Sequence, residues 1–369
     1  MEALILACAD RLVQNLKKKA QGDEDIDIKR MFDPYTMDVI ASTSFGLHLD
    51  AQGNPNHPFI KNAKELMEPS LHSPVILILL FFPYLMKFLK PVFVFFNVTF
   101  VRTMNFFVNI LDQLEKERAL NPSEKNYADL VQLLLNSHNM SIQKSELSED
   151  EQEVGKWKKK ALTRAEMAAN EILFLVAGYD TTSLTLTFAS YFLATHPHVQ
   201  DKLRSEIDKQ LQGSDPTYES VKNLGYLEQV ILETLRLYPP GVRVDRVATE
   251  DVVVRGLKIP KGTTCVIPIK TIHRHPDYWP DPDKFDPERF TPDAIARRHQ
   301  FAFLGFGMGP RNCIGMRLAK LEMKIALVKI LQRFTIKTCD ETPTEITTRK
   351  DKPNRPGKPI ILKVEERSF

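Results

Sequence analysis

One cysteine near the C-terminal end of the sequence stands in a setting that favours chemistry. Cys313 lies in a glycine-rich stretch, 301–317, and helical periodicity follows from Ile314 to Phe334. Backbone N–H groups and the helix dipole favour a thiolate just before a helix N-terminus, and Arg311 adds positive charge nearby. Such a thiolate can act as a nucleophile or as a metal ligand.

The neighbouring glycines favour the metal-ligand hypothesis. Gly307, Gly309 and Gly315 carry no side chains, so a large flat molecule such as haem can approach the sulfur closely. A nucleophilic cysteine needs a base, and the stretch contains no histidine, although another part of the fold can supply one. The plainest alternative is that an isolated cysteine is a small core residue.

The pattern Phe306-x-x-Gly309-x-Arg311-x-Cys313-x-Gly315 resembles the haem-binding loop of the cytochrome P450 superfamily, the haem-thiolate monooxygenases, at every signature position. The resemblance implies that Cys313 is the proximal thiolate ligand of the iron in haem b, where its electron donation favours O–O bond cleavage. It also implies that Phe306 shields the sulfur and that Arg311 pairs with a haem propionate. Gly309 and Gly315 would belong to the same cofactor site.

A second motif interrupts a long apolar helix, which the capping box at 163–166 opens and which is predicted over 163–196. Its polar residues include Asp180 and Thr181. A threonine in such a place is by default bonded only to its own helix. The segment nevertheless resembles the oxygen-activating motif of the same family. That resemblance implies that Asp180 and Thr181 deliver protons and that Ala177 lies over the haem, beside cofactor and substrate.

A third motif pairs a carboxylate with a guanidinium. Glu233 and Arg236 are three residues apart and can meet on one face of a helix. Most such pairs are exposed and contribute little to stability. The resemblance implies instead a buried, structural pair that Arg289 joins from a later segment.

The segment after this helix is assigned to the active site by resemblance alone. Pro240, Gly241 and Val242 would line the substrate, and Arg246 would meet a second propionate. Further on, the histidines at 273 and 275 suggest only a weak metal site, because no third ligand is evident.

The composition is that of a globular protein. The chain has 369 residues, 43% of them hydrophobic and 26% charged, with a formal net charge of +3. This balance does not favour nucleic acid as a partner. Neither a disulfide framework nor a zinc site is indicated, since no CxxC pair occurs among Cys8, Cys265, Cys313 and Cys339.

We expect a mainly α protein with small β-sheets, a cytochrome P450 fold in a single domain over residues 1–369. Helices are predicted at about 3–19, 33–46, 59–68, 101–120, 127–138, 163–196 and 314–334. Strands are predicted at 252–254, 263–269, 334–338 and 360–364. A polar surface loop is expected over 140–160.

An apolar stretch over 75–100 has two interpretations. Prolines divide it and neither part is long enough to span a bilayer, so it is either a buried core helix or a surface that dips into a membrane beside Lys87 and Lys90. The resemblance favours the membrane. The apolar run at 1–12 is too short to be an anchor.

The likeness covers essentially the whole chain and is strongest to family 3, whose members oxidise steroids and foreign compounds. Full-length members begin with a membrane anchor and first helices that do not precede Met1 here. We therefore expect an N-terminally truncated chain. The resemblance implies NADPH–cytochrome P450 reductase as electron donor, with cytochrome b5 as a further candidate, at the cytosolic face of the endoplasmic reticulum membrane.

The first hypothesis is a monooxygenase that inserts one oxygen atom from O2 into a lipophilic steroid or xenobiotic. One alternative is a haem-thiolate isomerase of the thromboxane-synthase type, which Asp180 and Thr181 argue against. Another is a catalytically inactive haem-binding product, which the missing front supports.

Overall fold

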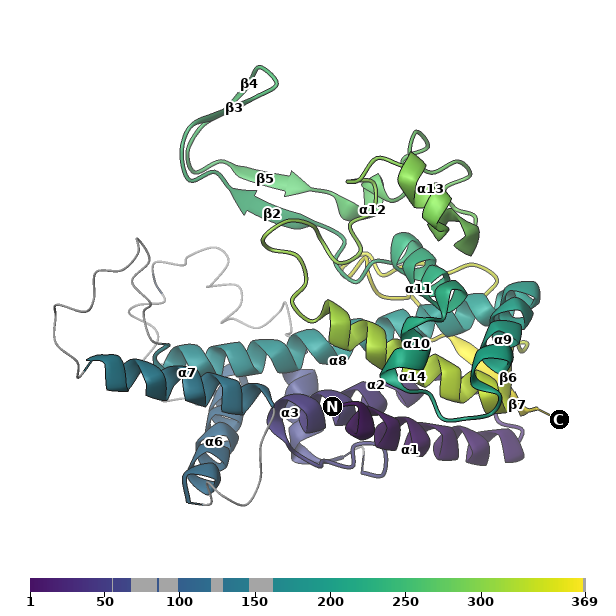
Figure 1. Ribbon diagram of the computed structural model, residues 1–369, viewed down its shortest axis with the longest axis horizontal. Coiled ribbons are helices and arrows are strands. Elements are labelled where there is room, and N and C mark those ends of the chain that lie inside the picture. Colours follow the sequence, from purple (N-terminus) through teal and green to yellow (C-terminus); the bar gives the residue numbers. More distant parts are fainter. Residues whose placement is uncertain (55, 68–84, 86–98, 121–128, 146–161, 368–369) are drawn as a thin grey trace. The chain divides into compact units, whose positions relative to one another are not determined.

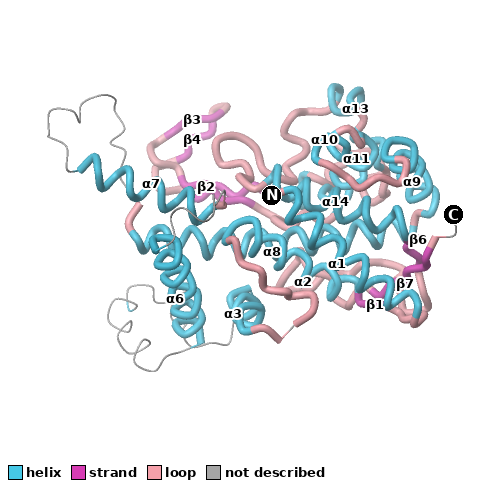
Figure 2. The backbone as a smooth tube through the Cα atoms, turned by 60° about the horizontal axis from the view of Figure 1, so that its bottom comes forward, coloured by secondary structure: helices cyan, strands magenta, loops and turns pink. Residues whose placement is uncertain are grey.

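The computed structural model describes residues 1–54, 56–67, 85, 99–120, 129–145 and 162–367 (Figure 1). Nearly all of the apolar stretch over 75–100, and most of the polar loop expected over 140–160, lie outside these residues. The chain forms two compact units, one of Met1 with Thr36–Asp180 and one of Glu2–Tyr35 with Thr181–Phe369. The described residues are mainly helical with small sheets, as the sequence predicts (Figure 2).

The regular elements of the first unit are all helices in its described residues. It contains the end of α2 (Ile28–Ile40), a π-helical turn at Ala41–Phe45, α3 (Pro58–Met67), α6 (Thr99–Leu120), α7 (Leu130–Ser145) and the first half of α8 (Arg164–Thr195). Its core is aromatic, since the rings of Phe59 and Phe107 meet edge to face with centroids 5.2 Å apart.

A buried guanidinium connects three parts of this unit. Arg118 of α6 binds the carboxylate of Asp129 through both terminal nitrogens, at 2.8 and 2.7 Å. The same side chain donates to the carbonyl of Phe45 at 3.0 Å. Asp129 lies directly before α7, so this one side chain ties α6 to the start of α7 and to the end of the π-helical turn.

The predicted capping box at the start of α8 is confirmed. Glu166 N–H donates to Thr163 Oγ1 at 3.2 Å, and Thr163 N–H donates to Glu166 Oε2 at 2.7 Å. The helix ends at Thr195, directly before His196 and Pro197. Among the described residues, α8 is the helix long and apolar enough to cross a membrane, but 67% of its most apolar window is buried within the protein. Core helices have this character as well.

The second unit packs short helices around two long ones. Its helices are α1 (Glu2–Gln21), the start of α2, the second half of α8, α9 (Pro197–Leu211), α10 (Tyr218–Lys222), α11 (Gly225–Leu237), α12 (Ile269–Ile272), α13 (Pro292–Arg297) and α14 (Met316–Arg333), with a 3-10 turn at Pro287–Phe290. Helices α1 and α14 lie side by side (Figures 1 and 2). The buried ammonium of Lys329 on α14 joins them, since it lies 2.5 Å from Asp10 on α1 and 2.7 Å from Asp215.

Three small antiparallel sheets complete the second unit. The first has the order β1 (Ile26–Asp27), β7 (Ile361–Glu366), β6 (Phe334–Lys337), with Ile26 opposite Leu362. The others are the pairs β2 (Val244–Val247) with β5 (Thr264–Ile267) and β3 (Val252–Val254) with β4 (Leu257–Ile259). Strands β1, β2 and β4 were not predicted.

Two predicted helix boundaries are wrong. The helix predicted from residue 33 begins earlier, because α2 starts at Ile28 and contains Pro34. Burial explains the earlier start, since Ile28 and Phe32 are 1% and 0% exposed. Helix α7 also continues to Ser145, beyond the predicted end at 138.

Candidate functional site

The glycine-rich loop places Cys313 just before α14, as the sequence predicts. Cys313 N–H donates to the carbonyl of Phe306 at 2.8 Å, and Gly307 N–H donates to the carbonyl of Leu304 at 2.9 Å. Gly307 and Gly309 have positive φ angles of 70° and 84°, which side chains disfavour. The glycines are therefore required by the turn that brings the cysteine to the helix N-terminus.

The surroundings of Cys313 fit a haem group. The Cys313 side chain is exposed, and the neighbouring Ile314 is 83% exposed, which is high for an aliphatic residue. A Cβ on Gly309 or Gly315 would meet no atom within 4 Å. A soft sulfur donor beside an open, partly apolar surface, with the exposed guanidinium of Arg311 close in sequence, suits a flat iron cofactor that carries carboxylates.

Phe306, a residue of the same loop, is half-buried. The ammonium of Lys320 on α14 lies 5.4 Å from the centroid of its ring. This cation–π contact fixes the ring between the loop and the first turns of α14.

The structure brings together the three residues of the third motif. Arg236 binds Glu233 through two bonds, from Nε to Oε2 at 2.7 Å and from Nη2 to Oε1 at 2.8 Å, and both side chains are fully buried. Arg289 Nε lies 3.5 Å from Glu233 Oε1. Burial raises the pKa of Glu233, against the opposing effect of Arg236. The three side chains thus form one largely buried cluster of hydrogen bonds and ion pairs.

Arg236 has a complete set of partners. Besides the two bonds to Glu233, Nη1 donates to the carbonyls of His273 at 2.9 Å and Pro282 at 2.6 Å. Nη2 donates to the carbonyl of Lys284 at 3.1 Å. All five N–H groups of the guanidinium are satisfied, so α11 is connected to the segment over 273–284 by this one side chain.

His273 is the residue whose place in the site the sequence did not predict. Its side chain is fully buried, Leu304 N–H donates to Nε2 at 2.8 Å, and Nδ1 lies 3.1 Å from the carbonyl of Arg236. Because an amide N–H can only donate and a carbonyl can only accept, the proton resides on Nδ1. Burial lowers the pKa of His273 to about 4, so the ring is neutral at physiological pH.

The weak metal site considered for His273 and His275 is not formed. Both ring nitrogens of His273 are hydrogen-bonded to backbone groups. In the part of the chain that the structure describes, no group of three histidine, cysteine or acidic side chains could hold a metal ion.

The polar residues of α8 differ in exposure. Ala177 and Thr181, four residues apart, are exposed, whereas Asp180 is only 6% exposed. Thr185 Oγ1 donates to the carbonyl of Thr181 at 2.8 Å, the back-bonding expected of a mid-helix threonine. Ala177 and Asp180 belong to the first unit and Cys313 to the second, so their meeting at one cofactor stays a prediction.

The predicted substrate-lining residues lie between α11 and β2. The carbonyl of Pro240 accepts from Asn354 Nδ2 at 2.9 Å, and that of Val242 accepts from Lys270 N–H at 3.1 Å. Gly241 between them is exposed. These bonds hold the segment through its backbone carbonyl groups and do not involve its side chains.

Arg246 lies on β2 opposite Cys265 of β5. Its guanidinium is exposed, and Nη1 donates to the carbonyl of the adjacent Asp245 at 2.8 Å. The predicted contact with a propionate is compatible with this exposure.

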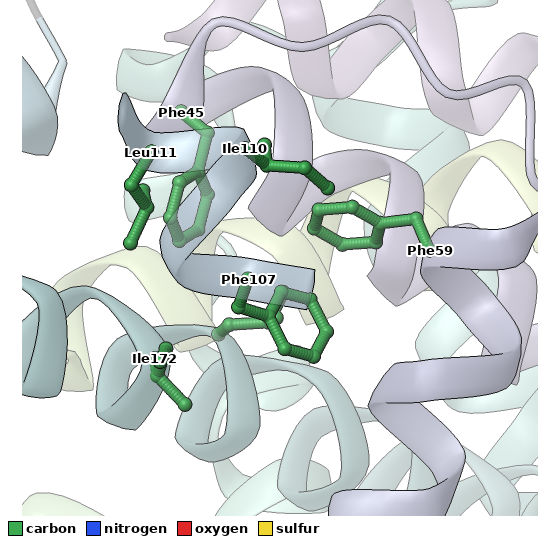
Figure 3. Close-up of a pocket in the computed structure, with 7 residues that line it drawn as sticks. Phe45, Phe59, Phe107, Ile110, Leu111 and Ile172 are labelled. Carbon is green, nitrogen blue, oxygen red and sulfur yellow. The ribbon is translucent and has the colours of Figure 1, made fainter. Parts of the chain in front are cut away.

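Two cavities do not suit a lipophilic substrate, one because of its size and the other because of its charged lining. Figure 3 shows a cavity of about 10 Å³ in the first unit, which holds at most one water and lies among Phe45, Phe59, Phe107, Ile110, Leu111, Ile172 and Leu175. A cavity of about 440 Å³ in the second unit is large enough for a small molecule. Its lining, however, includes four charged side chains, namely Lys270, Arg274, Asp283 and Glu345.

Comparison with known proteins identifies the class. Residues 1–364 match the family described as Cytochrome P450. The chain is 41% identical over 361 residues to cytochrome P450 3A25 of Mus musculus, covering 97% of this chain and 68% of that protein. It is 40% identical over 369 residues to cytochrome P450 3A29 of Sus scrofa, covering 99% and 69%. To cytochrome P450 3A5 of Homo sapiens it is 40% identical over 372 residues, covering 100% and 70%.

The fold, the cysteine loop and these matches show that the chain belongs to the cytochrome P450 family of haem monooxygenases. Its relatives place it within family 3. Haem is therefore the cofactor of its class, and the residues around Cys313 fit that group.

Proposed function

We propose that this protein is a haem-thiolate monooxygenase that inserts one oxygen atom from O2 into a lipophilic small molecule of the steroid or xenobiotic type. One observation carries the proposal. Cys313 is exposed at the N-terminus of α14, in a turn that the Cys313 N–H to Phe306 carbonyl bond of 2.8 Å closes. An exposed, soft sulfur ligand held in such a turn suits a haem iron.

Residues around this sulfur are assigned to the cofactor. Cys313 ligates the iron of haem b, and Phe306 covers the sulfur. Arg311 and Arg246 are exposed guanidinium groups that bind propionates. Gly309 and Gly315 leave room for the ring beside the loop. When bound, haem supplies the activation of oxygen and the acceptance of single electrons.

Proton handling is assigned to α8. Asp180 is a buried carboxyl group beside the exposed hydroxyl of Thr181, and the two residues relay protons to the active site. Ala177 is small enough to leave space above the cofactor. Pro240, Gly241 and Val242 line the substrate. Backbone hydrogen bonds at Pro240 and Val242 hold their segment, so their apolar side chains can contact a ligand.

Electron donor and location are assigned by relationship to family 3. We assign NADPH–cytochrome P450 reductase as the donor, with cytochrome b5 as a second electron donor, and the cytosolic face of the endoplasmic reticulum membrane as the location. The apolar stretch over 75–100 is assigned to contact with that membrane, and it lies almost entirely outside the described residues.

The test is the difference spectrum of the reduced protein with carbon monoxide. Wild-type protein should show a thiolate-type Soret band, and Cys313→Ala should lack that band while retaining its far-UV circular dichroism. Cys265→Ala is the matched control, because Cys265 belongs to β5 and not to the loop. A band of equal intensity in Cys313→Ala would refute the assignment of the ligand. Turnover of a steroid with added reductase then tests the reaction.

A further inference from the structure

His273 stands between the buried ion pair and the loop that carries the cysteine. Its Nδ1–H donates to the carbonyl of Arg236 at 3.1 Å, and its Nε2 accepts from Leu304 N–H at 2.8 Å. The contact with Arg236 is reciprocal, since Arg236 Nη1 donates to the His273 carbonyl at 2.9 Å. One imidazole therefore connects α11 to the first residue of the loop over 304–313, which we call the cysteine loop.

The bonds continue from Leu304 to the sulfur-bearing residue. The Leu304 carbonyl accepts from Gly307 N–H at 2.9 Å, and the Phe306 carbonyl accepts from Cys313 N–H at 2.8 Å. The peptide that His273 holds is thus the first fixed point of the turn that ends at Cys313.

The same ring also fixes the residue before the loop. Phe303 stacks on the imidazole with ring centroids 5.2 Å apart and an interplanar angle of 9°. Leu304 itself is only 8% exposed, so no solvent can replace Nε2 as the partner of its N–H. An unpartnered amide in this place would be strongly unfavourable.

We infer that His273 is a positioning residue for the Cys313 thiolate, which it holds in place by fixing the Leu304 amide against α11. This inference rests on the proposed function only for the role of Cys313. The bond to Leu304 is a property of the chain itself and is testable without the cofactor.

Three variants of the full chain distinguish the hydrogen bond at Nδ1 from the hydrogen bond at Nε2. His273→Phe keeps the ring shape and the stacking on Phe303 but removes both hydrogen bonds. His273→Gln can place its amide oxygen at the position of Nε2 and keep the bond to Leu304. His273→Asn is shorter, so its amide reaches only the Arg236 side and leaves the Leu304 amide without a partner.

The first measurement is hydrogen exchange at the Leu304 amide. Loss of a buried hydrogen bond should speed its exchange on the order of tenfold to a hundredfold in the Phe and Asn variants. The Gln variant should stay close to wild type. The second measurement is the carbon monoxide spectrum at equal haem content, in which the thiolate-type fraction should fall in the Phe and Asn variants and be restored in Gln.

Each outcome decides the inference. Leu304 exchange unchanged in the Phe variant, or Asn equal to Gln in both measurements, would overturn it. Global unfolding of all three variants would also overturn it, because His273 would then support the whole unit rather than the cysteine loop. If wild-type protein gives no thiolate-type band, the proposed function fails, and the exchange comparison still decides the role of His273.

Discussion

Ile40 of α2 fills the space beside Gly178 of α8, so closely that a Cβ added to Gly178 would lie 2.5 Å from Ile40 Cδ1. A side chain at position 178 would force the Ile40 side chain or the two helices to shift. Gly178 lies two and three residues before Asp180 and Thr181. The contact with Ile40 and these polar residues therefore belong to the same turn of α8.

We predict that Gly178→Ala destabilises the protein by about 1–2 kcal/mol, since overpacking a core outweighs the helix propensity that alanine gains. Ile40→Val removes Cδ1, and in that background Gly178→Ala should be neutral or stabilising. Urea unfolding of the four proteins in this double-mutant cycle measures the coupling. Additive effects would show that the two residues do not constrain each other.

The buried pair of Glu233 and Arg236 gives a second prediction. Arg236→Lys cannot reproduce two parallel bonds and three carbonyl contacts, so the Glu233 carboxylate is left without its full set of partners. We expect a loss of about 3–5 kcal/mol in stability, measured by chemical unfolding. The matched control is Lys202→Ala, which removes an exposed ion pair with Glu288 and should change stability by less than about 1 kcal/mol.

His273 gives a third prediction, on acid stability. Its pKa is lowered by burial to about 4, with a further lowering by the nearby charges of Arg236 and Arg274. The unfolded chain binds the proton from pH 6.5 downwards and the folded chain does not, so stability is lost as the pH falls from about 6.5 to about 4, by up to about 3 kcal/mol. Stability curves at several pH values measure this loss.

His273→Gln should lack that loss of stability between pH 6.5 and 4. His275→Gln is the control, since the His275 side chain is 47% exposed and should leave the wild-type curve unchanged. A curve for His273→Gln that follows wild type would show that another group causes the acid sensitivity.

Glu171 gives a fourth prediction, of opposite sign. Its side chain is 1% exposed, and among the described residues its Oε2 has no hydrogen-bond partner. Burial first, and then the negative charge of Glu115, raise the pKa of Glu171 to about 7, while Arg118 opposes the shift. The folded chain therefore holds a proton that the unfolded chain has released, and stability falls as the pH rises from about 4.5 to about 7, by about 3 kcal/mol at most.

Glu171→Gln should be more stable than wild type at pH 8 and similar to it at pH 5, as measured by urea unfolding at each pH. Glu115→Gln tests the cause, because removing that charge should lower the pKa of Glu171 and reduce the difference. Equal stability of wild type and Glu171→Gln at pH 8 would contradict the prediction.

Local motifs with strong spacing rules were the predictable part of the fold and the site. The capping box at Thr163 and Glu166 forms as expected, and the stretch before α14 brings Cys313 to a helix N-terminus. Glu233 and Arg236 meet because residues three apart share a helical face. Each of these depends on contacts within a few residues, which periodicity and spacing describe well.

Long-range contacts were not predictable. The partners of His273 come from Arg236 and Leu304, each more than thirty positions away in sequence. Strand β1 has only 2 residues, too few for an alternating pattern to appear. The helix start predicted at 33 was wrong because burial of Ile28 and Phe32 in the tertiary structure extends α2 to Ile28.

The pairing of β1 with β7 has a consequence for the order in which the protein folds during synthesis. Strand β1 can form its pairing only after Leu362 has been synthesised. The second unit therefore cannot be completed before that residue has left the ribosome. Residues 36–180 of the first unit are synthesised well before Leu362. Ile26 and Asp27 therefore stay without their strand partner while the first unit is synthesised, and an unpaired strand edge is prone to premature association.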